Sequence, residues 1–191
     1  RRVVKQPNDF YKALARGVEY ASTIYGGKDF ALAYGGNEMP GYHTGPACHL
    51  GFITGARHSH LDSAGYSIDQ RAYASNMKPT IEETVSQLFD EECWRQVLSS
   101  LVICYFARGN YTPEFVTKAL NVLGYNLDQQ DLRRLGREIL KVKNNFKFRE
   151  GFKYENLRVP NRVFETETPN GRIDEDQLRE GVKLYFSKIL E

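Results

Sequence analysis

The chain has 191 residues, 41% of them hydrophobic and 26% charged, and its formal net charge at pH 7 is +2. This composition supports a buried core and excludes the disordered class of chains. Because Lys and Arg are spread among Asp and Glu, the charge pattern also excludes proteins that select nucleic acids or membranes through a basic patch.

The first helix is predicted for residues 10–25. Asn8 and Asp9 are typical of a helix cap, apolar residues follow at helical spacing, and a glycine pair ends the pattern. A short extended segment is predicted at residues 30–34. Residues 35–69 are rich in glycine and contain all four histidines of the chain, so we expect functional groups to concentrate there.

More helices are predicted in the middle of the chain. Thr80, with Glu83 three residues later, has the pattern of a capping box, and the helix that it starts is expected to continue to Phe89. Residues 91–107 are predicted as a separate helix. Because its later part is apolar on nearly every side, we expect this helix to be central and buried.

The last part of the chain has well-marked helix boundaries. A short helix is predicted between Thr112 and Gly124, and a longer one with a basic outer face begins at Asp128. Residues 153–171 lack helical spacing and predict an extended tail. Asp174 then begins a terminal helix.

These elements predict an all-α, multihelical fold with two small helical subdomains. Residues 1–75 hold the first helix and the glycine- and histidine-rich loop region, and residues 76–191 form a helical subdomain with an extended tail and a terminal helix. The longest apolar stretch falls short of the roughly 20 residues that span a bilayer. Since the sequence begins without Met, we expect further residues upstream.

The three cysteines, Cys48, Cys93 and Cys104, lack the even number and the spacing of a disulfide framework, which favours a reducing cytoplasm. Composition alone predicts that Cys93 and Cys104 are buried structural thiols. The sequence has no Cys-x-x-Cys pair, so an iron-sulfur cluster cannot be assembled from this chain alone.

The histidines are the clearest sign of a site, because imidazole exchanges protons and binds metals near neutral pH. For His43 and His49, a functional role and an incidental loop position stay equally open. A zinc site is another interpretation, although the spacing matches no familiar zinc motif. Its ligands would be His58, His60 and either Cys48 or His49.

Residues 57–62 favour a functional role more strongly. They combine Arg57, His60 and Asp62 between two glycines, Gly55 and Gly65, whose missing side chains allow a ligand to approach the backbone closely. His60 suits the role of a general acid or base, which requires a reacting group within hydrogen-bond reach.

The order of several segments resembles the aldehyde ferredoxin oxidoreductase family. In residues 30–42, Glu38 and Pro40 match a family element in which these residue types follow a short apolar strand. Residues 51–61 are similar to a helix and loop that end in a histidine near the pterin and the substrate. Residues 99–104 resemble an Asp-x-x-Gly-Leu-Cys element. Further similarity covers residues 135–139, residues 145–152, residues 157–160 and the terminal helix.

The resemblance implies roles for individual residues. His60 would handle the proton of the reaction. Cys104 would be the last ligand of a four-iron four-sulfur (4Fe-4S) cluster, whose other ligands lie outside this chain. Arg57 and Asp62 would take part in binding the cofactor.

The Asp-x-x-Gly-Leu-Cys element holds a pterin in the family through its Asp and its backbone. By resemblance, the pterin contacts of this chain would be Ser99, Val102 and Ile103. Ser99 stands where the family has Asp, and Val102 stands where it has Gly. These two departures predict a weakened pterin contact.

The resemblance also implies an activity, the oxidation of aldehydes to carboxylic acids at a tungsten or molybdenum centre held by two pterins. Electrons would leave through the 4Fe-4S cluster to a ferredoxin-like carrier. An N-terminal pterin-platform domain of the same polypeptide would supply the remaining cluster ligands, so we expect the isolated chain to be inactive. A homodimer stays open.

Two other classes of protein fit the same sequence. The first is a noncatalytic helical interaction domain that has lost the cofactor. The second is a small hydrolase with a divalent metal bound by histidines. Its ligands would be His43, His49, His58 and His60.

Overall fold

The computed structural model describes residues 5 and 8–190. Of the residues that it describes, 62% are helical, which confirms the all-α, multihelical class. A small antiparallel hairpin pairs β1 (Ala33–Tyr34) with β2 (Asn37–Glu38). Gly35 and Gly36 join the two strands with φ of 54° and 84°, and a two-residue hairpin turn requires this left-handed pair.

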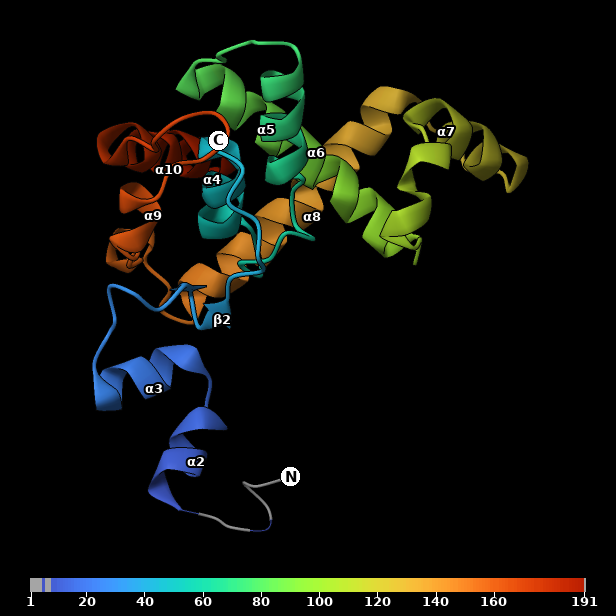
Figure 1. Ribbon diagram of the computed structural model, residues 1–191. Helices are drawn as coiled ribbons and strands as arrows, with labels where there is room; N and C mark the ends of the chain where they lie inside the picture. Colours follow the sequence, from blue (N-terminus) through green and yellow to red (C-terminus); the bar gives the residue numbers. More distant parts are fainter. Residues whose placement is uncertain (1–4, 6–7, 191) are drawn as a thin grey trace.

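The first predicted helix is wrong as a single element. The chain forms α2 (Asp9–Leu14) and α3 (Val18–Tyr25), separated at Gly17, whose φ of 92° does not fit a helix. The Glu38 carboxylate accepts a hydrogen bond from the Val18 N–H at 3.1 Å and so satisfies one donor at the start of α3. In Figure 1 these two helices, coloured blue, stand apart from the other helices.

The glycine-rich region is not simply a loop, because it contains α4 (Pro46–Thr54) and the start of α5 (Gly65–Ala74). Every residue of α4 after its proline is buried. The carboxylate of Asp69 lies in α5 and accepts hydrogen bonds from the N–H groups of Ala47 at 3.1 Å and Cys48 at 2.8 Å. A residue distant in sequence therefore caps the buried helix, and local spacing cannot reveal such a cap.

The middle of the chain forms one helix, not the two predicted. The capping box of Thr80 and Glu83 is confirmed, and α6 (Ile81–Ser100) continues from it without a break. The apolar residues that follow leave the helix and enter a short 3₁₀ helix, η1 (Tyr105–Asn110), in which Phe106 is 99% exposed. The predicted buried helix is therefore wrong beyond Ser100.

The later helices start where they were predicted to start. Thr112, Asp128 and Asp174 each accept a hydrogen bond from a backbone N–H in the first turn of a helix. The helices are α7 (Pro113–Val122), α8 (Gln129–Arg149) and α10 (Glu175–Leu190). The predicted extended tail is interrupted by η2 (Tyr154–Asn156) and α9 (Arg162–Glu165).

One core joins the hairpin to the helices. α6 packs along α8 and α10, and α4 packs against α5 and α10 (Figure 1). The largest fully buried apolar side chains of this core are Tyr34, Leu50, Phe52, Ile53, Leu88, Leu140, Leu178, Tyr185 and Phe186. A smaller cluster of Val97, Val116 and Leu132 anchors α7. Among the described helices, none is both long and apolar enough to cross a membrane.

Candidate functional site

The segment between α4 and α5 carries three of the predicted site residues, and we call residues 55–64 the histidine loop. Asp62 is buried and closes this loop on itself. Its carboxylate accepts hydrogen bonds from the Arg57 N–H at 2.8 Å, from Arg57 Nε at 2.8 Å and from the Ser59 N–H at 3.2 Å. Arg57 and Asp62 therefore meet, and the contact between them shapes the backbone around His60.

His60 is partly buried in this loop. Its ring centroid lies 5.5 Å from that of Tyr42, which stacks on Tyr66 at 4.7 Å. Burial lowers the pKa of His60, and the nearby charge of Arg95 lowers this pKa further, whereas Asp62 opposes the shift. The imidazole is therefore biased toward its neutral form, which is the form that accepts a proton.

Two charged residues of α6 bind the backbone of the histidine loop through hydrogen bonds. Glu92 is fully buried, and its Oε1 accepts a hydrogen bond from the Ala56 N–H at 3.0 Å. Arg95 is 2% exposed, and its Nη1 donates to the carbonyl oxygens of His60 at 3.2 Å and Leu61 at 3.0 Å. Sequence reasoning missed both residues, because α6 also carries exposed charged residues and the local sequence does not show which charges are buried.

Glu92 belongs to a larger buried network. The hydroxyl of Tyr185 donates to its second carboxylate oxygen, and burial raises the pKa of both groups above their ordinary values. The charge of Lys147 lies close enough to favour the ionised form of Glu92, while burial lowers the pKa of Lys147 to about 8. A buried carboxylate and a half-buried ammonium thus lie next to the loop.

His58 is engaged by this network. Its Nε2 lies 3.2 Å from Lys147 Nζ, and its Nδ1 lies 3.1 Å from the carbonyl oxygen of Phe52. Because a carbonyl only accepts, Nδ1 carries the proton and Nε2 accepts from the lysine. Both ring nitrogens of His58 are therefore used within the chain.

His43 and His49 form a hydrogen-bonded series with Tyr34. His43 Nε2 lies 3.0 Å from the Thr166 carbonyl oxygen, and His43 Nδ1 lies 2.8 Å from His49 Nε2. His49 Nδ1 lies 2.8 Å from the Tyr34 hydroxyl. Since the carbonyl only accepts, two neutral rings leave one order of donors, from Tyr34 through His49 and His43 to Thr166.

The four histidines therefore do not form a single cluster. Three of them use their ring nitrogens in the contacts given above. Among the described residues, no group of three or more His, Cys, Asp or Glu side chains is arranged to hold a metal ion. The zinc site and the histidine-bound metal of a hydrolase thus gain no support from the geometry.

Residues 99–104 contain the last two residues of α6 and the turn that follows this helix. The N–H of Val102 donates to the Ser99 carbonyl at 3.0 Å, and the N–H of Ile103 donates to the Leu98 carbonyl at 3.0 Å, which together make a Schellman helix end. Val102 occupies its left-handed position with φ of 57°, where glycine is usual. The backbone thus has the conformation that the family's glycine would favour. The amides of residues 102 and 103 are already bonded, so they do not fit as pterin contacts.

Ser99 retains one feature of the aspartate that it replaces. The Tyr105 hydroxyl donates to the carbonyl oxygen of Arg95 at 3.2 Å, so the neighbouring Ser99 hydroxyl donates to the Tyr105 oxygen. The Ser99 side chain is exposed, and its remaining lone pairs can accept a hydrogen bond from outside the chain. Ser99 therefore fits a pterin ring N–H as an acceptor.

Cys104 lies directly before Tyr105 and is exposed. The expectation of a buried thiol, drawn from composition, is wrong because the chain leaves the helix at residue 101 and turns outward. An exposed thiol fits a ligand of a cluster whose other ligands come from elsewhere. Cys93, by contrast, is buried in α6, as predicted.

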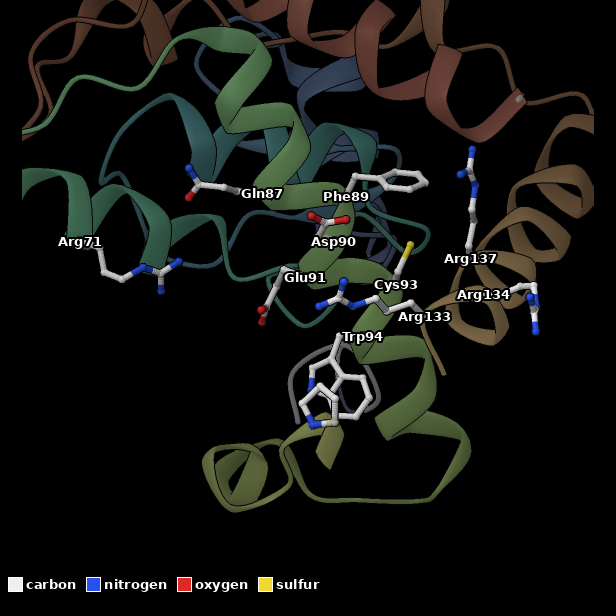
Figure 2. A pocket seen from close by; sticks show the side chains of 11 residues that line it. Arg71, Gln87, Phe89, Asp90, Glu91, Cys93, Trp94, Arg133, Arg134 and Arg137 are labelled. Atoms are coloured by element: carbon white, nitrogen blue, oxygen red, sulfur yellow. The ribbon is translucent and has the colours of Figure 1, made fainter. Parts of the chain in front are cut away.

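A separate groove of about 630 Å³ lies between α5, α6 and α8. Figure 2 shows its side chains, among them Arg133, Arg134 and Arg137 on α8 and Trp94 on α6. The groove contains none of the site residues predicted from the sequence. Arg134 pairs with Asp131, and Arg137 donates to the Lys188 carbonyl, so the chain itself engages part of this positive charge.

Comparison with known proteins gave one family. A family model described as aldehyde ferredoxin oxidoreductase, domains 2 & 3, matches residues 1–189. No curated protein matched the chain. The family match extends over the hairpin, the histidine loop and the segment that ends in Cys104.

Proposed function

Because the chain belongs to the aldehyde ferredoxin oxidoreductase family, we propose that it is the helical C-terminal part of an enzyme that oxidises aldehydes to carboxylic acids. A tungsten or molybdenum centre with two pterins would supply the oxidation chemistry when bound. The observation that carries the proposal is the anchoring of His60: buried charges of α6 hold the loop of the one histidine whose ring makes no hydrogen bond to any described residue.

His60 accepts one of the two protons that are released, with two electrons, when an aldehyde and water become a carboxylic acid. Its lowered pKa keeps the ring neutral near pH 7, and a neutral imidazole is a competent base at that pH. Arg57 and Asp62 hold the loop in shape, and Ser99 offers an acceptor to a pterin ring. In this proposal the residues of the chain position His60 and transfer a proton, while electron transfer would be the task of the bound metal, pterins and cluster.

Cys104 would hold iron as a thiolate. The other three ligands of a 4Fe-4S cluster would come from an N-terminal domain of the same polypeptide, which would also provide the main pterin platform. The cluster would supply electron transfer to a ferredoxin-like carrier. The exposure of Cys104 supports this role, because a thiol inside the helical core could not reach ligands from another domain.

A noncatalytic interaction domain is the second candidate. Its support is the exposure of apolar side chains in and just after the family element, where Val102 is 91% and Phe106 is 99% exposed. Exposed apolar surface of this kind marks a contact with another domain or protein. An enzyme with an N-terminal domain would also cover this surface, so turnover has to separate the two candidates.

The test is replacement of His60 by Ala in protein expressed from the complete reading frame. The proposal expects a large loss of aldehyde oxidation while the tungsten or molybdenum and iron contents stay unchanged. Arg134→Gln, which changes an exposed charge on α8, is the matched control and should retain activity. Unchanged turnover in His60→Ala would remove the catalytic role.

A further inference from the structure

We propose that Arg95 is a positioning residue for His60, fixing the loop that carries this imidazole and setting the charge around it. The importance of Arg95 for catalysis rests on the proposed function, in which His60 accepts a proton. Its physical part, the influence of Arg95 on the His60 ring, can be measured without turnover. Arg95 does not itself need to touch a substrate.

The first support is the direct contact. Arg95 Nη1 donates to the backbone carbonyl of His60 itself at 3.2 Å and to that of Leu61 at 3.0 Å. The guanidinium is 2% exposed, so water does not compete for these hydrogen bonds. The position of the His60 backbone is therefore fixed by a residue of the rigid central helix.

The second support is how Arg95 is held. Its Nε donates to Glu91 Oε1 at 2.8 Å, one helical turn earlier on α6. The ring of Tyr105 lies 5.1 Å from the guanidinium carbon, at cation–π distance. Since Tyr105 directly follows Cys104, Arg95 lies between the loop of the proposed proton acceptor and the segment of the proposed cluster ligand.

The third support is the balance of charges around His60. Arg95 faces the ring from α6 and Asp62 faces it from the loop, while Tyr42 contacts it from the segment before α4. The negative charge of Asp62 is largely neutralised by an ion pair with Arg57, whose Nε lies 2.8 Å from Asp62 Oδ1. Glu91, the ion-pair partner of Arg95, is 33% exposed and thus partly screened by water.

Arg95 also has one buried N–H group that is not hydrogen-bonded to any described residue. Within the part of the chain that the structure describes, its Nη2 is buried without a hydrogen-bond partner. A guanidinium that is desolvated and only partly neutralised disfavours a second positive charge beside it. Arg95 therefore acts against protonation of His60, in the same direction as burial.

The experiment is a histidine titration by NMR on the chain and on three variants, Arg95→Gln, Arg95→Lys and Glu91→Gln. Loss of the Arg95 charge should raise the pKa of His60, whereas Arg95→Lys should leave it near the wild-type value. Loss of the Glu91 charge should shift it the opposite way, to lower pH. His58 faces Lys147 and should titrate unchanged in all three variants.

Two results would overturn the proposal. One is a His60 pKa that does not rise in Arg95→Gln, and the other is an equal rise in Arg95→Gln and Arg95→Lys, which would show that the charge of Arg95 does not set the His60 pKa. If Arg95→Gln does not fold, Glu91→Gln still decides the question, because it alters only a partly exposed side chain and predicts a shift of known sign.

The kinetic counterpart uses the protein from the complete reading frame. A higher His60 pKa should move the acidic limb of the pH profile of kcat/KM to higher pH in Arg95→Gln, at unchanged metal content. If His60→Ala abolishes turnover but this limb does not move, the inference fails while the proposed function stands. If His60→Ala has no effect, the proposed function fails, and the NMR titration still tests the influence of Arg95.

Discussion

Glu92 Oε1 accepts a hydrogen bond from the backbone N–H of Ala56 at 3.0 Å, across 36 positions of the sequence. This contact makes a fully buried carboxylate part of the support for the histidine loop. A buried carboxylate resists ionisation, so the loop is held by a group whose ionisation opposes folding.

The ionisation of Glu92 should appear in stability. Its pKa is raised in the folded chain, so folding favours the protonated form and the free energy of unfolding falls as pH rises from the unfolded pKa, about 4.5, through the folded one. Glu92→Gln removes the ionisable group and with it this loss of stability at higher pH. We expect the variant to gain on the order of 1–3 kcal/mol relative to wild type between pH 5 and pH 8, by urea unfolding.

The matched control for Glu92→Gln is Glu138→Gln, at an exposed position of α8. Its stability relative to wild type should stay nearly constant over the same pH range. A difference for Glu92→Gln that is flat with pH, or that falls as pH rises, would contradict the buried ionisation of Glu92.

Val102→Gly should stabilise the chain. Val102 holds the left-handed position of a helix end with φ of 57°, whereas Gly124 and Gly151 hold the same position at the ends of α7 and α8. The side chain is 91% exposed, so little burial is lost. Relief of backbone strain, less the extra freedom of glycine in the unfolded chain, should raise the free energy of unfolding by about 1 kcal/mol.

Val122→Gly provides the contrast, since Val122 is 87% exposed but closes α7 in a helical conformation. This variant should lose about 0.5–1 kcal/mol because glycine disfavours helix. Thermal unfolding measures both. The same sign of change in the two variants would show that the conformation of residue 102 is not strained.

Removal of the Tyr34 hydroxyl should destabilise the chain, because this hydroxyl begins the hydrogen-bonded series through His49 and His43. Tyr34→Phe leaves His49 Nδ1 buried without its donor, at a cost of about 1–3 kcal/mol in unfolding free energy. Tyr73→Phe, at a 63% exposed residue of α5, is the control and should be nearly neutral. Equal stability of the two variants would argue against a hydrogen bond from Tyr34 to His49.

Burial lowers the pKa of His49 to about 3. The ring should therefore remain neutral down to about pH 4, with its proton on Nε2. Nitrogen-15 NMR distinguishes the two neutral tautomers and the charged ring. A titration of His49 near pH 6 would contradict the order of donors given above.

Replacement of Cys104 tests its role as a ligand. In protein from the complete reading frame, Cys104→Ser should change the paramagnetic resonance signal of the iron-sulfur cluster, because a weaker oxygen ligand would replace a thiolate. Cys93→Ala, which changes a buried thiol of α6, should leave the signal unaltered. An unaltered signal in Cys104→Ser would remove this residue from the ligand set.

The starts of helices were predictable, since a cap is a local pattern. Thr80, Asp128 and Asp174 each bond to a backbone N–H three residues later, within the span that a sequence shows directly. The end of α6 was not predictable in this way. The residues after Ser100 are more apolar than those before it, yet several of them are exposed, because contacts with the rest of the chain decide which residues are buried.

The site was predictable only in part, for a similar reason. The sequence indicated Arg57, His60 and Asp62 because they lie within a few residues of one another. Glu92 and Arg95 reach the same loop from another helix, with partners more than 30 positions away. Such contacts depend on the packing of α6 beside the loop, and no local spacing encodes them.

The most direct test of the proposed function is the cofactor content of the protein from its complete reading frame. It would be expressed anaerobically with tungstate or molybdate and assayed for metal, pterin and iron together. The family assignment and the proposed roles of Ser99 and Cys104 predict that all three copurify in a fixed ratio. A folded protein that contains none of them would contradict the enzyme and favour the interaction domain.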